Sequence, residues 1–138
     1  MKRVFLIFLV AVSLIAISLY PTTTAAREPA TLIVDQSAIC LNVVDREPVE
    51  TGNTFSTATD KLFCFTKILN ARVPVEITHV WYFNDIERAK VILPVKSICW
   101  RTYSSKIIQK HETGEWHVDI LGADNKLLQT LQFKIVSP

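Results

Sequence analysis

The segment Trp100–Lys106 (WRTYSSK) gathers side chains that could hold a ligand. A planar cation, a phenol, three hydroxyls and an ammonium group lie within this segment, and such a set can bind a carboxylate, a phosphate or a sugar face. Side chains alternate along a strand, so Arg101, Tyr103 and Ser105 would share one side, and Trp100, Thr102 and Ser104 the other. We predict a binding surface that also includes a stacking tyrosine and a histidine upstream: Arg101, Tyr103, Lys106, Ser105, Tyr82 and His79.

A structural role for the same segment stays open. Arg101 could satisfy carbonyl groups at a strand end, and the Ser104-Ser105 pair could form a turn. Arginine and tyrosine are enriched in recognition surfaces, but they do not prove one.

Metal chemistry lacks a supporting pattern. Two of the three histidines, His79, His111 and His117, could bind zinc or another divalent metal together with Asp119 or Glu112, but the sequence has neither an HxH nor an HExxH pair. Strand alternation also places the first histidine inward and the third outward. We therefore expect no metal site and no cofactor.

Nucleophilic catalysis is weakly supported as well. Ser104 and Ser105 have no surrounding G-x-S-x-G or S-x-x-K pattern. Cys99 stands two residues before an arginine that would lower its pKa, but such a residue is more often a buried strand residue. Glu112 and Glu115 could form a hydrolytic pair only at a suitable separation. A hydrolase of envelope polymers, using histidine and carboxylate groups, stays the alternative function.

The elements that must position these side chains are strands. Short runs with period-two alternation recur, with turn residues every 8 to 12 positions in the second half, as in a sandwich. No amphipathic helix is evident. We predict an all-β domain, an immunoglobulin-like antiparallel β-sandwich of about seven strands, with a small barrel as second choice. The strands are expected at 37–44, 61–68, 75–83, 89–94, 97–103, 115–120 and 126–136.

Other details of this prediction concern the core and the connections. We expect Trp81, Trp100 and Trp116 to fill the interior, and Leu127 to face it with the other apolar residues of the last strand. The residues at 51–60 have loop composition, and Pro48 should end a strand or lie at an edge.

The N-terminus has the pattern of an export signal. A basic start precedes 17 residues, 4–20, that are apolar apart from two serines, and small residues follow at 24–26. We predict a signal peptide helix within residues 1–26 and a β-sandwich domain at 27–138, placing the protein in the periplasm or outside the cell. The alternative is an uncleaved helix at 4–20 that anchors it to the inner membrane.

Charge and cysteine content narrow the choice of partners. Without residues 1–26, Lys+Arg and Asp+Glu balance at 13 each, so we expect no nucleic-acid binding. Three cysteines allow at most one intramolecular bridge, and Cys40 could pair with Cys64 if their strands are neighbours; otherwise all three are buried thiols.

Three stretches resemble a known family: ITHVWYFND, LPVKSICWRTYSSK and GEWHVDILGADNKLLQTLQFKI, with REPVE upstream. They resemble the bacterial family named domain of unknown function 2914, across roughly Val43 to Ile135. The resemblance implies an exported or membrane-attached β-rich domain without an established activity. It singles out eight positions, and the cysteines are not among them: His79, Trp81, Trp100, Arg101, Ser104, Ser105, Lys106 and Trp116.

These observations favour a non-catalytic, extracytoplasmic binding or interaction module of the bacterial cell envelope. Its partner would be an envelope glycan or a protein, and the sequence does not decide between them. A purely structural or assembly role is the third hypothesis, which predicts an exposed apolar patch or a free sheet edge.

Overall fold

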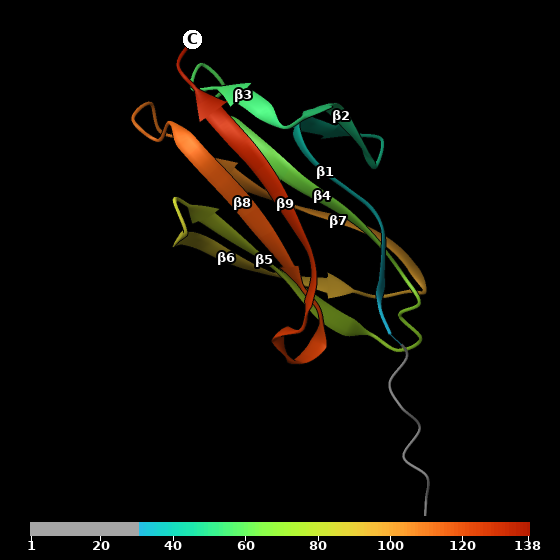
Figure 1. Ribbon diagram of the computed structural model, residues 1–138. Helices are drawn as coiled ribbons and strands as arrows, with labels where there is room; N and C mark the ends of the chain where they lie inside the picture. The colour runs from blue at the N-terminus through green and yellow to red at the C-terminus, as the bar shows by residue number, and fades with distance from the viewer. Residues whose placement is uncertain (1–30) are drawn as a thin grey trace, which may run out of the picture.

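The computed structural model describes residues 31–138, so the predicted signal peptide and its helix lie outside the described residues. In this range no helix is long and apolar enough to cross a bilayer. The described chain forms nine strands and one short 3₁₀ turn (Figure 1). They are β1 (Ile33–Val44), β2 (Glu47–Gly52), β3 (Thr54–Ser56), β4 (Lys61–Leu69), β5 (Val75–Phe83), β6 (Ile86–Val95), β7 (Cys99–Ile107), β8 (Gly114–Leu121), η1 (Ala123–Asn125) and β9 (Leu127–Val136).

The strands pair into two sheets that pack face to face as a sandwich. Sheet A has the order β2-β1-β4-β7, and sheet B has the order β3-β9-β8-β5-β6. The pairs are antiparallel except for β3, whose three residues run parallel to β9. The prediction of an all-β sandwich is therefore confirmed.

The core lies between the sheets and is built from the alternate residues of each strand. Trp81 and Trp116 are fully buried there, and Trp100 packs half-buried against a second cluster near the other end. The inward side predicted for β5 is the observed one, because Ile77 and His79 are also buried. The three tryptophans thus occupy the interior as expected.

Two tight turns fix the registers of their hairpins. Asp45 and Arg46 join β1 to β2, and Asn84 and Asp85 join β5 to β6; all four have positive φ. Two-residue turns of this left-handed type match the twist of the strands that they connect. The pairing of Phe83 with Ile86 follows directly from the second turn.

The prediction was wrong about several element boundaries. Residues 51–60, expected to form a loop, include the end of the edge strand β2 and the short β3, because pairing with β1 and β9 supplies partners that local composition does not reveal. Pro48 fits β2 because an edge strand needs no donor on its free side. Leu127, expected in the core, is exposed, since the β8–β9 register shifts between Ile120 and Leu121.

Candidate binding surface

The six residues predicted to form one binding surface lie in four different places. Arg101, Tyr103 and Ser105 share the outer side of β7, opposite Lys67, Phe65 and Phe63 of β4. This first group stays together as the alternation predicted.

The other three residues are separated from that group. His79 is fully buried between the sheets, and Tyr82 lies on the outer side of sheet B. Lys106 pairs with the inward-facing Leu62, and its Nζ donates to the carbonyl oxygen of Ile107 at 2.8 Å. The prediction that Tyr82, Arg101, Tyr103 and Lys106 share a single face was therefore wrong, because Tyr82 belongs to the other sheet.

His79 links the two sheets through buried hydroxyl groups. Its Nδ1 lies 2.7 Å from Ser104 Oγ on β7, and its Nε2 lies 2.9 Å from Thr66 Oγ1 on β4. The indole Nε1–H of Trp81 donates to the same Ser104 Oγ at 3.1 Å. All four side chains are buried, so each polar atom depends on these partners.

One assignment of donors and acceptors accounts for all three hydrogen bonds of this network. Trp81 donates to Ser104, Ser104 donates to Nδ1 of His79, and Nε2–H of His79 donates to Thr66. Burial lowers the pKa of His79 to about 4, so the ring is neutral at pH 7. Among residues 31–138, no carboxylate forms a hydrogen bond with the ring of His79. The geometry is that of a structural tie between the sheets.

The outer side of β7 presents an aromatic pair to solvent. The ring of Tyr103, 51% exposed, meets the ring of Phe63 edge-on with centroids 5.7 Å apart. The ammonium of Lys61 lies 5.7 Å from the centre of the Phe63 ring. Exposed Ser105 and Ile107 continue the same side of β7. We call the side chains of Lys61, Phe63, Tyr103 and Ser105 the β4–β7 face.

Arg101 borders this face and is held by a distant hairpin. Its Nε lies 3.3 Å from Oε1 of Glu47, at the start of β2. A straight β1 would carry Glu47 about eight residue steps, or about 26 Å, beyond the level of Arg101. The β1–β2 hairpin must therefore fold back over the outer side of sheet A. That fold accounts for the complete burial of Phe65, which lies on this outer side.

The outer side of sheet B has a different character. Tyr82 stacks on His117 with centroids 4.5 Å apart and an interplanar angle of 12°. The pKa of Tyr82 is raised by partial burial and then by the carboxylates of Asp119 and Glu87. This second aromatic pair thus stands among acidic groups, whereas the β4–β7 face stands among basic ones.

Glu112, considered from the sequence as a metal-binding or hydrolytic carboxylate, is buried and engaged. Its Oε1 accepts from Nη2 of Arg88, and its Oε2 accepts from the backbone N–H of Gln109 at 3.1 Å. Its carbonyl oxygen accepts from Nε1 of Trp116 at 3.0 Å. The residue fastens the β7–β8 connection. Its ion pair was not predicted, because Arg88 is 24 residues away in sequence.

The three cysteines are free thiols. Strands β1 and β4 are neighbours, as a bridge required, but Cys40 pairs with Phe63 and Cys64 pairs with Ile39. The two thiols therefore point to opposite faces of sheet A and cannot meet. Burial raises the pKa of both, whereas Cys99 is exposed.

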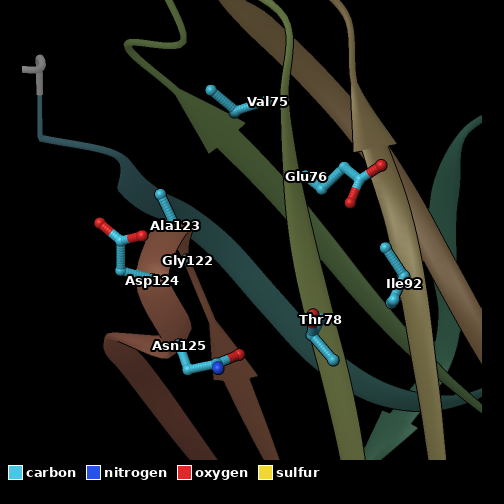
Figure 2. Close-up of a pocket in the computed structure, with 8 residues that line it drawn as sticks. All are labelled: Val75, Glu76, Thr78, Ile92, Gly122, Ala123, Asp124 and Asn125. Atoms are coloured by element: carbon cyan, nitrogen blue, oxygen red, sulfur yellow. The ribbon is translucent and has the colours of Figure 1, made fainter.

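A shallow pocket of about 400 Å³ lies at the other end of sheet B (Figure 2). Figure 2 shows the β8–β9 turn, Gly122 to Asn125, on one side and Glu76, Thr78 and Ile92 of β5 and β6 on the other. None of the six predicted site residues lines it. No local sequence pattern predicts this pocket, because it depends on the packing of a turn against a sheet.

The order of the motifs along β5 to β9 relates the chain to a known group. Residues 74–135 match the model of the family described as Protein of unknown function (DUF2914). Over these residues the chain is similar to the DUF2914 family. The resemblance predicted from the sequence is confirmed over these residues, whereas the upstream REPVE motif lies outside the match. No curated protein matches the chain.

Proposed function

We propose that the domain is a non-catalytic binding module that acts outside the cytoplasm, in the bacterial cell envelope. The observation that carries the proposal is the β4–β7 face. It combines a half-exposed tyrosine edge-on to a phenylalanine, a free hydroxyl and a lysine, with Arg101 at its border. An aromatic platform beside cations suits a sugar ring with an acidic substituent, or an acidic protein segment.

The fold supports a recognition role. We infer an immunoglobulin-like arrangement, because β1, β4 and β7 share one sheet while β9, β8, β5 and β6 share the other. Trp116, near the start of β8, bonds back to the carbonyl of Glu112, much as the tyrosine corner of such domains does. Sandwiches of this kind serve many functions, so the surface rather than the fold must carry the argument.

The buried histidine and carboxylate that a hydrolase could use are held by partners within the protein. His79, the histidine that a hydrolase would need, is enclosed and bonded to hydroxyl groups. The buried Glu112 is committed to Arg88. Export to the periplasm or beyond rests on the signal-like residues 1–26 of the sequence.

The test compares two tyrosines that each belong to an aromatic pair on the outer side of a sheet. Tyr103→Ala removes the exposed ring of the β4–β7 face, and Tyr82→Ala removes a stacked ring from the other sheet. We expect the first to weaken binding to purified peptidoglycan or to envelope proteins at least about tenfold, as loss of an aromatic anchor does, and the second to leave it unchanged. Equal binding by wild type and a folded Tyr103→Ala protein would count against the proposal.

A further inference from the structure

Four chain segments meet at the end of the sandwich where the described chain begins. The backbone N–H of Asn70, in the β4–β5 connection, donates to the carbonyl of Ile98 at 2.9 Å. Its side-chain Nδ2 donates to the carbonyl of Thr31 at 2.7 Å. The β8–β9 turn lies beside Val75 in the pocket described above. Figure 1 shows this turn and the start of β1 at the lower end of the view, opposite the C-terminus.

Each of these segments exposes a large aliphatic side chain. The four are between 50% and 65% exposed. Exposed aliphatic groups gathered at one end of a domain favour a surface that becomes covered. They are Ile33, Val73, Ile98 and Leu127.

Basic residues stand next to three of these aliphatic groups. Arg72 precedes Val73, Lys126 precedes Leu127, and exposed Lys96 lies in the connection that holds Ile98. We call this set of four aliphatic and three basic residues the basic apolar end. Carboxylates do not cancel it: Asp35 is paired with Lys67, which leaves Glu76 and Asp124 beside the pocket.

The opposite end differs in charge. Its turns carry exposed Asp45, Asp60 and Asp85, against Arg46 and Lys110. It also exposes Ile86. Exposed apolar residues therefore occur at both ends, but only one end combines them with a positive balance. Aliphatic tips beside cations are the combination that suits an anionic lipid surface.

The chain outside the described residues leads to the same end. Thr31 is the first described residue, and its carbonyl is bound there. The apolar run 4–20 is ten residues upstream, a stretch that can span at most about 35 Å. If that run is retained in a bilayer, the basic apolar end is the part of the domain nearest to it.

We propose that the basic apolar end docks on an anionic phospholipid bilayer. The aliphatic side chains enter the boundary between headgroups and acyl chains, and Arg72, Lys96 and Lys126 contact the lipid phosphates. This surface shares no residue with the β4–β7 face, which lies on the outer side of sheet A. Failure of either proposal therefore leaves the other standing.

The experiment places a fluorescent label at each end of the full-length chain. In a Cys99→Ser background, Val73→Cys and Ile86→Cys give single exposed thiols of nearly equal exposure, while Cys40 and Cys64 stay buried. The labelled proteins are mixed with vesicles of phosphatidylcholine, with or without phosphatidylglycerol. Quenching is measured with iodide in water and with doxyl groups on the lipid.

We expect the label at Val73→Cys, with phosphatidylglycerol present, to be quenched by the lipid and shielded from iodide, and the label at Ile86→Cys to stay aqueous. Arg72→Gln and Lys96→Gln should each lower the ratio of docked to undocked label about fivefold, whereas Arg46→Gln should not. Equal aqueous exposure of both labels would overturn the proposal. Shielding of the Val73→Cys label without vesicles would also overturn the proposal, because it would indicate contact with a second copy of the chain. Docking of equal strength with and without phosphatidylglycerol would overturn it as well.

Discussion

The two sides of β7 differ in what surrounds them, although their residues alternate within one short segment. On the inner side, Ser104 is buried and shared by His79 and Trp81. On the outer side, Tyr103 and Ser105 face solvent. Residue types that look equally suited to chemistry therefore divide into a structural set and a surface set.

Burial determines whether a polar side chain of β7 has a structural role or is available to a ligand. An enclosed hydroxyl must meet all its hydrogen-bonding needs within the protein, so it becomes part of the architecture. An exposed hydroxyl can exchange water for a ligand. The Ser–His contact at 2.7 Å would suggest catalysis if it lay in a cleft, but here it joins two sheets.

Removing the adjacent hydroxyls of Ser104 and Ser105, on opposite sides of β7, should give the largest difference in the free energy of unfolding. Ser104→Ala leaves the indole N–H of Trp81 and Nδ1 of His79 without a partner, at a cost of about 3 kcal/mol of unfolding free energy. Ser105→Ala, one residue along and exposed, should change the value by no more than about 0.5 kcal/mol. Urea denaturation of both variants measures the difference. Similar values would mean that the network contributes little.

The sequence could predict the two-layer β fold because alternation and turn residues are local signals. It also divided β7 correctly, with Ser104 on one side and Tyr103 on the other. It could not assign Tyr82 and Tyr103 to different sheets, since strand order depends on contacts between distant segments. The grouping of β1, β4 and β7 in one sheet is a property of topology rather than of any single motif.

The hairpin over sheet A marks a second limit. The sequence indicated that a strand ends at Pro48 or lies at an edge there, but nothing local predicts that β1 bends back so that Glu47 reaches Arg101. The same holds for the ion pair that Arg88 forms with Glu112. Charged partners far apart in sequence leave no periodic trace, so the borders of the candidate surface required coordinates.

The protonation of His79 offers a smaller test of the inner side. Its folded pKa of about 4 lies below the ordinary 6.5, so the unfolded chain binds the proton more readily. Stability is fully present above pH 6.5 and is lost as the pH falls towards 4, with a loss of about 2 kcal/mol between pH 7.5 and pH 5. The control is His79→Gln, which cannot titrate. Parallel pH profiles of unfolding free energy for the two proteins would contradict the assigned burial.

The smallest expected effect on stability concerns the ion pair between Glu47 and Arg101, on the outer side of β7. Both partners are partly exposed, so a double-mutant cycle with Glu47→Gln and Arg101→Gln should give a coupling below about 1 kcal/mol. The coupling should fade in high salt, because solvent-exposed charges are screened. Glu50→Gln on the same hairpin serves as the matched control, since Glu50 is exposed and forms no ion pair among residues 31–138. A coupling that survives high salt would mean that the hairpin shields this pair as the sandwich shields Ser104, and the two sides of β7 would then differ less than the structure indicates.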